Sequence, residues 1–537
     1  MKTLRFTPLV ILLVFSIALG GGIVGNTNQS AAFVRTLNRN ASTDVDAVYF
    51  NPAGLMRLED GLHLSLSNQS IFQTKTAVNN YQYLNADEFV GDVIVPLFPN
   101  FYIAYKTGKL AFSAGFEPIG GGGSANFENG LPSFELPVSD LVPGLAAEGQ
   151  SVSAYDIDIA FEGSSIYYGF QAGVSYKVND MLSVGVGGRY VAASNSYVGH
   201  LKDIAINLGG NWTPATTFFT GAATQYTAAA TSSTTAADGL QPLIDAGGGG
   251  LTLAQAQMMN QLTAAQVAEL EGGLTQAGID PTGYTVDNIQ TAYRGVAASA
   301  TASAAEMTAK SALLADQEVD VAQTATGITP IISVFLTPFD GLDIAFRYEG
   351  LTELELVNKA DADKQALVGL EADGTKIYQF PDGAKTNTDM PAMMALGVAY
   401  KVMPALRAEF NLNYYLHSGV NWDGREDDVE NGYEAGVAVE YCLNDKLKAS
   451  VGFLNADGGA KPAYQRDVSY SLKSNTIALG AAYAVSPNLV VNVGGMDTFY
   501  QDCDRPFSHT LGADDISVIE TYKKTSIGFA IGVDYKF

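Results

Sequence analysis

The chain has 537 residues and a formal net charge of -26, with 16% of its residues charged, 10% aromatic and 56 of them glycine. This length would ordinarily divide into several water-soluble domains, but the scarcity of charge and the repeated apolar alternation favour a single large sheet. The negative charge lies mostly in segments predicted to be loops, such as 423–430 and 502–515. It argues against nucleic acid as a partner, and it is compatible with cation-bridged contacts to anionic lipid heads.

The N-terminus has the pattern of an export signal. Lys2 and Arg5 precede an apolar run from Phe6 to Leu19, and Gly20 supplies a small residue for cleavage. We therefore predict a signal peptide over residues 1–20. The alternative is a retained anchor, but the run is shorter than the ~20 residues that a spanning helix needs.

Fourteen later segments alternate apolar and polar residues with a period of two. In the last of them, Phe529, Ile531 and Val533 alternate with Ala530 and Gly532, so one face suits lipid and the other a lumen. The predicted strands are 61–72, 100–106, 109–118, 164–178, 181–195, 329–338, 341–354, 391–403, 405–418, 430–443, 446–456, 473–486, 488–502 and 520–537. Since no apolar run of about 18 or more residues follows the N-terminus, a closed sheet is the structure that can cross a membrane.

We thus predict an all-β fold, a fourteen-stranded antiparallel transmembrane β-barrel over 61–537, in the outer membrane of a Gram-negative bacterium and as a monomer. Short turns alternate with long connections, which places both termini in the periplasm. The connection 196–328 is too long to be structureless. Thr252 with Gln255 and Thr263 with Gln266 have capping-box spacing, so this extracellular loop is predicted to be partly helical.

An apolar stripe recurs every three or four residues in the same loop, at Ile289, Tyr293, Val296, Ala300, Ala304 and Met307. Its ordinary role is to pack on a neighbouring helix. The functional alternative is an apolar surface that captures a hydrophobic ligand at the barrel mouth.

Catalytic, metal and cofactor motifs are not found in the sequence. The four histidines, His63, His200, His417 and His509, have no metal-ligand spacing, and there is no GxSxG motif. Cys442 and Cys503 are predicted at opposite rims of a wall ~25 Å tall, too far apart for a disulfide. We expect two free thiols, no cofactor and no enzymatic activity.

The most specific local motif precedes the first predicted strand. There Asp46-Ala47 is followed by Asn51-Pro52-Ala53-Gly54-Leu55. In this position, between a signal peptide and fourteen strand segments, the motif resembles that of the FadL/TodX family of outer-membrane transporters for long-chain fatty acids and hydrocarbons. The resemblance implies that residues 21–60 form a hatch inside the barrel, and that Asn51, Pro52 and Ala53 belong to it in a ligand-dependent gating role. A rigid turn is the alternative, since proline fixes φ and asparagine bonds local backbone.

The resemblance also implies a lateral opening at a kink in the third strand. Here that strand reaches Phe116 and then breaks at Glu117-Pro118-Ile119-Gly120, where proline and glycine weaken strand pairing. Phe116, Glu117, Pro118 and Gly120 are therefore the predicted opening. The alternative is that the strand simply ends there.

Three inward-facing arginines, Arg189, Arg347 and Arg407, could contact a ligand carboxylate. Acidic neighbours on the same inward rows, including Glu349 and Glu409, favour ion pairs that brace the barrel instead. The sequence leaves both roles open.

The function predicted from these features is passive transport of long-chain fatty acids or other hydrophobic small molecules. The steps would be capture by the loop, hatch rearrangement and lateral release. The alternatives are a general diffusion porin and, with less support, a barrel adhesin or enzyme.

Overall fold

The computed structural model describes residues 22–25, 27–371, 374–512 and 514–537. The predicted signal peptide lies outside these residues.

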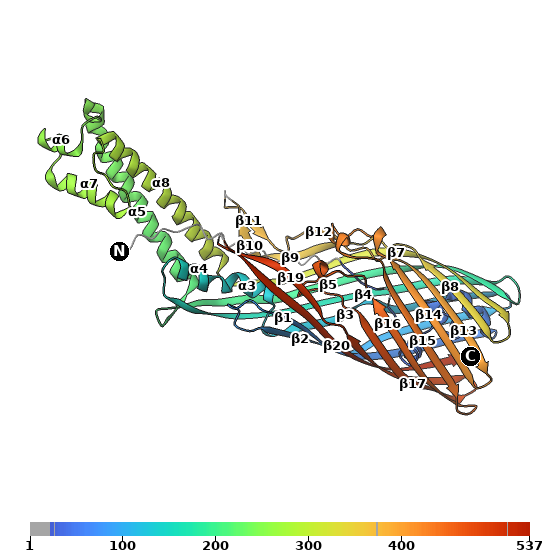
Figure 1. The fold of residues 1–537 in the computed structure, drawn as a ribbon. Coiled ribbons are helices and arrows are strands. Elements are labelled where there is room, and N and C mark those ends of the chain that lie inside the picture. The colour runs from blue at the N-terminus through green and yellow to red at the C-terminus, as the bar shows by residue number, and fades with distance from the viewer. Residues whose placement is uncertain (1–21, 26, 372–373, 513) are drawn as a thin grey trace.

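Fourteen strands form a closed antiparallel barrel, as predicted (Figure 1). In wall order they are β1 (Gly61–Asn79), β2 (Glu88–Thr107), β3 (Leu110–Phe127), β4 (Val152–Lys177), β5 (Leu182–Leu208), β7 (Gln317–Phe339), β8 (Leu342–Glu349), β13 (Ala392–Met403), β14 (Leu406–Leu416), β15 (Gly432–Cys442), β16 (Leu447–Asp457), β17 (Ser474–Ser486), β18 (Leu489–Tyr500) and β20 (Asp514–Lys536). The last strand pairs with the first from His63↔Lys536 to Asn79↔Glu520, which closes the wall.

The outer face of the wall is apolar. On β20, Phe529 and Ile531 are 54% and 57% exposed, whereas inward Ala530 is 7% exposed. Exposed apolar side chains on a closed sheet belong in hydrocarbon, so the barrel is built to cross a membrane. Within the described ranges, the helices are all too short or too polar to span a bilayer.

The strands of the first half extend well beyond the predicted bounds. The predicted strand 100–106 is part of β2, Glu88–Thr107, and β5 and β7 stay paired up to Leu201↔Gln317. Much of the stretches 73–99 and 119–163, which lie between predicted strands, is therefore also strand. Four short strands also pair with the wall at the edge where these long strands end: β6 (Asn211–Pro214), β9 (Glu355–Gln365), β12 (Lys385–Asn387) and β19 (Cys503–Leu511). β10 (Leu367–Leu370) and β11 (Lys376–Tyr378) form a separate hairpin.

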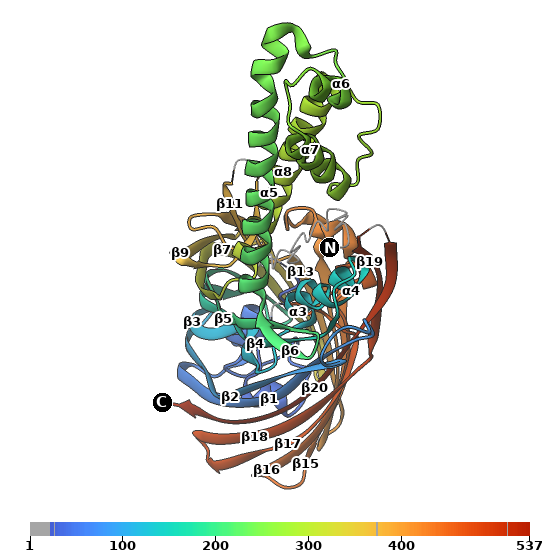
Figure 2. The same cartoon turned by 90° about the vertical axis from the view of Figure 1, so that its left-hand side faces the viewer.

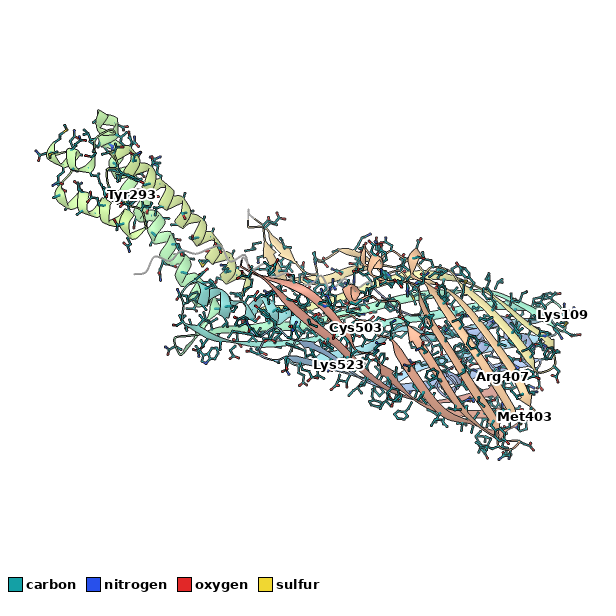
Figure 3. All side chains as sticks on the ribbon, viewed as in Figure 1. Lys109, Tyr293, Met403, Arg407, Cys503 and Lys523 are labelled. Atoms are coloured by element: carbon teal, nitrogen blue, oxygen red, sulfur yellow. The ribbon has the colours of Figure 1, made fainter. Side chains whose placement is uncertain are left out.

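A helical arm projects from this edge (Figures 1 and 2). It consists of α5 (Ala215–Leu243), α6 (Leu253–Met258), α7 (Ala264–Gln276) and α8 (Val286–Leu313), with a π-helical turn at Ile244–Gly248. Both predicted capping boxes are present, at Thr252 and Thr263. We call this end of the barrel the arm end and the opposite end the short-turn end, where Lys109 and Met403 lie in Figure 3.

The apolar stripe of α8 is used for packing. Ile289 and Tyr293 are buried against α5 and α7 (Figure 3), and Met307 packs with Phe219 at the base of the arm. The packing interpretation of the stripe is therefore correct. Two short helices, α3 (Pro132–Ser139) and α4 (Leu141–Ala147), lie over the arm end of the barrel, and Asp140 between them accepts a hydrogen bond from Tyr81 at 2.7 Å.

The segment before β1 folds inside the lumen. It contains α1 (Ala31–Val34), α2 (Ala47–Phe50) and a 3-10 helix (Pro52–Arg57), and nearly all of its residues from 28 to 56 are buried. We call the described residues from 22 to 60 the hatch.

Candidate functional site: a hatch seated in the barrel

Wall glycines let the hatch backbone approach the inner face of the barrel. At each of six positions, a Cβ atom would lie less than 3 Å from a hatch atom of residues 31–41; the six are Gly397, Gly436, Gly452, Gly480, Gly494 and Gly532. We call them the glycine track. At Gly452 the overlap would be with the carbonyl oxygen of Thr36. Since real Cβ atoms are not found so close to backbone, any side chain there would displace the hatch or the strand.

One arginine holds the hatch in its own shape. The guanidinium of Arg39 donates to Asp46 at 2.7 Å, to Asp44 at 2.6 Å and to Ser42 at 2.8 Å. Burial raises the pKa of Asp44, but Arg39, Lys448 and Arg35 together hold that pKa well below its usual range. The hatch thus has internal contacts of its own in addition to its contacts with the wall.

The Asn51-Pro52-Ala53 element fastens this unit to four strands. The Asn51 amide donates to the carbonyl oxygens of Val334 (3.3 Å) and Phe346 (3.2 Å). The Pro52 carbonyl accepts from Ser175 at 2.6 Å, and Ala53 bonds Ser333 through its N–H (3.0 Å) and Ser183 through its carbonyl (2.8 Å). Pro52 also begins the 3-10 helix, where its missing N–H costs nothing. These contacts give the element a structural role; its gating role stays a proposal.

Arg189 and Arg347, two of the predicted carboxylate contacts, already have partners. The guanidinium of Arg189 donates to Glu349 at 2.7 and 2.8 Å and to Gln171 at 2.7 and 3.0 Å, and it lies 3.5 Å from Glu117. Arg347 lies 3.3 Å from Glu349 and donates to the carbonyl oxygen of Tyr49 in the hatch.

The ring of Tyr49 completes this buried cluster. It lies 4.7 Å from the Arg189 guanidinium and 5.1 Å from that of Arg347, which adds cation–π attraction. Two arginines balance two glutamates, so the group is internally neutralised. These contacts fit the interpretation that the ion pairs brace the barrel wall. Through Tyr49 they also hold the hatch.

The third arginine is also engaged. Arg407, on β14, pairs with Glu409 at 2.7 Å and donates to the carbonyl oxygen of Ala41 at 2.9 Å. All three predicted arginines therefore connect wall strands to each other or to the hatch. The structure brings Arg189 and Arg347 together at Glu349 and Tyr49, whereas Arg407 pairs with Glu409 elsewhere.

The wall is interrupted beside the hatch. β2 and β3 pair at Val93↔Ala125 and again at Phe101↔Phe116, with no ladder between these points. β3 does not end at Pro118, contrary to the alternative left open by the sequence. It continues along β4 through two bulges, Pro118/Gly120 and Gly121/Gly123. The bulges allow a strand that contains this proline and these glycines to stay paired with β4. We call the unpaired stretch the β2–β3 gap.

The hatch covers this gap from inside. Thr27 donates from its backbone N–H to the carbonyl of Ile119 at 2.8 Å, and a Cβ on Gly120 would overlap the side chain of Val24. On the outer face of the gap, Ile94 and Leu97 of β2 are 67% and 75% exposed. The gap therefore has hatch residues on its inner side and an apolar border on its outer side.

The described residues hold no cluster of three or more His, Cys, Asp or Glu side chains that could bind a metal ion. Cys442 and Cys503 are both free, as predicted.

Two solved structures share this architecture. The crystal structure of a Pseudomonas aeruginosa FadL homologue aligns over 96% of this chain and 99% of that chain, at a TM-score of 0.55 and 12% identity. The chain has the FadL-type barrel fold. The structure of the TodX deltaS2S3 mutant monoaromatic hydrocarbon channel aligns over 96% and 100% of the two chains, at a TM-score of 0.50 and 12% identity. No protein-family model and no curated protein sequence matches the chain. These likenesses confirm the predicted fold.

Proposed function

We propose that this protein is a passive channel for hydrophobic small molecules in a bacterial outer membrane, and that cargo leaves it sideways through the β2–β3 gap. The arm end would face outward and the short-turn end the periplasm. No energy source is needed, because an apolar solute moves down its gradient from the mouth into the bilayer.

The β2–β3 gap is the observation that carries this proposal. A break in a membrane-spanning ladder exposes backbone groups that lipid cannot satisfy, so it needs a compensating reason. Here Thr27 of the hatch satisfies the Ile119 carbonyl at the bulge. Moving the N-terminal hatch segment would both free the lumen side of the gap and leave its outer side open to hydrocarbon.

The extent of the hatch argues against a general diffusion porin. Hatch residues bond β3 through Ile119, β7 through Ser333, β13 through Leu396, β14 through Glu409 and β18 through Asn492. These contacts are distributed around the barrel, whereas a porin needs a wide aqueous lumen. In planar bilayers the protein should be nearly silent, and large steady openings would refute the proposal.

The gap itself is tested by filling it. Gly122 is the unpaired residue of the second bulge, and a Cβ there would meet nothing within 4 Å, so Gly122→Trp adds a large side chain whose Cβ atom clashes with nothing. Gly188→Trp is the matched control on the outward face of β5, where the nearest atom to a Cβ is 3.6 Å away. We expect Gly122→Trp alone to slow uptake of a radiolabelled alkane into cells that carry the protein. Equal uptake by both variants would rule out the gap as the exit.

A further inference from the structure

Two lysines face each other in the lumen above the hatch. Lys75 on β1 is the direct cross-strand partner of Lys524 on β20, and both lie on the inward rows that include Ala77 and Tyr522. They are 449 positions apart in the chain and meet only because β20 closes the barrel on β1. The outward residues beside them, Thr74 and Thr525, are polar, so the pair lies just above the apolar belt.

Neither ammonium has a carboxylate partner. Across the residues that the structure describes, no ion pair or side-chain hydrogen bond involves Lys75 or Lys524. The chain has 56 acidic side chains for 30 basic ones, so counter-ions are abundant elsewhere. The carboxylate of Asp467 attracts Lys75 at longer range, but it forms no ion pair with it and accepts instead from the backbone N–H groups of Ser133 (2.8 Å) and Val468 (2.9 Å). Like charges directly opposite each other destabilise a sheet, so a bound anion would stabilise this pair.

Tyrosines support the pair. The Nζ atom of Lys75 lies 4.8 Å from the ring centroid of Tyr470, and that of Lys524 lies 4.9 Å from the ring of Tyr500. Tyr470 is itself fixed, because its hydroxyl donates to the Lys523 carbonyl at 2.7 Å and accepts from the Thr76 N–H at 3.1 Å. Rings held over the lysine heads restrict the ammonium groups to the lumen.

Apolar side chains lie on both sides of the pair. Tyr522 and Leu472 are buried beside Ala77 in one cluster. Toward the hatch, the inward rows of β1, β18 and β20 first present the polar residues Gln73, Thr498 and Ser526 and then the apolar residues Ile71, Met496 and Ala530, of which the last two pack with Val34 of α1. A ligand that fits both features has one anionic head and a hydrocarbon tail.

We propose that Lys75 and Lys524 form a binding site for the carboxylate of an amphipathic cargo, whose tail extends toward the hatch. The proposal rests on the proposed function and names its substrate class. It also replaces Arg189, Arg347 and Arg407 as carboxylate contacts, because those three are already bonded to glutamates and to the hatch.

The test compares ligands that differ only in the head group. Binding of radiolabelled dodecanoate and dodecan-1-ol to the purified full-length protein in detergent should favour dodecanoate. Lys75→Met with Lys524→Met should weaken dodecanoate binding about tenfold or more, because it removes two charge-assisted contacts, and should leave dodecan-1-ol unchanged. Lys75→Arg with Lys524→Arg should keep the preference.

Lys523→Met is the matched control. Lys523 is the exposed neighbour of Lys524 on the outward row of β20 (Figure 3), so its removal changes net charge without changing the lumen. Acetate should not compete with dodecanoate, and full competition by acetate would show an ion-only site and overturn the proposal.

Two further outcomes separate this site from the proposed function. Equal binding of both ligands, unaffected by Lys75→Met with Lys524→Met, would refute the carboxylate site and leave a channel for neutral compounds. Failure to bind either ligand, together with no alkane uptake by cells, would overturn the channel and the site alike.

Discussion

Adding one methyl group to the glycine track should unseat the hatch. A Cβ on Gly452 would overlap the Thr36 carbonyl oxygen and lie 3.1 Å from the Thr36 Cα. Thr36 cannot easily withdraw, because its hydroxyl donates to Ala32 at 2.9 Å and its carbonyl accepts from the Asn38 amide at 3.0 Å. Overpacking of this kind costs about 1–3 kcal/mol. If the hatch rather than β16 gives way, the displaced population rises roughly 5- to 150-fold.

Two measurements follow the hatch in Gly452→Ala. Hydrogen exchange should show faster exchange at residues 31–41, and planar-bilayer recordings should show more frequent openings than the nearly silent parent. Gly188→Ala is the control, because that Cβ points outward with its nearest atom 3.6 Å away. If Gly452→Ala matches both the parent and the control in exchange and in conductance, the close seating of the hatch on the track is refuted.

Three further predictions concern the hatch, the buried cluster and the arm. Asn51→Ala removes two donated bonds, to Val334 and Phe346, at about 1 kcal/mol each; proteolysis of the hatch should speed up while heat-modifiable barrel mobility on gels is unchanged, and a variant that never assembles would contradict this. Arg189→Met leaves buried glutamates uncompensated, which should lower the free energy of unfolding by roughly 3–5 kcal/mol; denaturant unfolding in detergent measures it, and a loss below 1 kcal/mol would contradict the bracing role. At the base of the arm, burial raises the pKa of Glu148 to about 7. Because this folded pKa lies above the unfolded value, the packing of Glu148 at the base of the arm is favoured at pH 5 and weakens as the pH rises through about 7. Hydrogen exchange of residues 303–313, corrected for intrinsic rates, should therefore be slower at pH 5.5 than at pH 8 in the parent. In Glu148→Gln it should be equal at both pH values.

The strands β13 to β18 could be predicted from sequence to within about two residues at each end, whereas β20 begins at Asp514 rather than at 520. The segments 391–403 and 405–418 correspond to Ala392–Met403 and Leu406–Leu416. These strands scarcely extend beyond the apolar belt, so outward apolar and inward polar residues alternate along nearly their whole length.

The same rule fails in β2. Its residues from Glu88 onward are paired with β1, yet the segment holds Pro96 and Pro99, and prolines in a segment argue against a strand. Neighbouring strands are joined by backbone hydrogen bonds, and the residue composition of a segment does not reveal these bonds. For this reason a deletion of the predicted loop 196–328 would also remove paired residues of β5 and β7.

The candidate site shows a similar division. The inward position of Arg347 and its acidic neighbour Glu349 follow from alternation within one strand. Their union with Arg189 and with Tyr49 of the hatch depends on how the barrel closes around its N-terminal segment. The sequence shows some members of the glycine track as small inward residues, such as Gly532, but the placement of all six against hatch residues 31–41 depends on strand register.

The two polar zones of the lumen differ in their charge. Beside the hatch, the charges of Arg189 and Arg347 are cancelled by Glu117 and Glu349 at the gap, so a hydrophobic cargo passing there meets no net charge. Above the apolar belt, the lysine pair of β1 and β20 carries two positive charges that form no ion pair with a carboxylate of the described residues. A charged head is costly in hydrocarbon, so a site that binds an anion before the exit would retain the head while the tail reaches the hatch. Cargo would then be released toward the bilayer only when its carboxylate is protonated or has followed the tail past the lysines, which makes the lysine pair, rather than the arginine cluster, the step at which anionic and neutral compounds are distinguished.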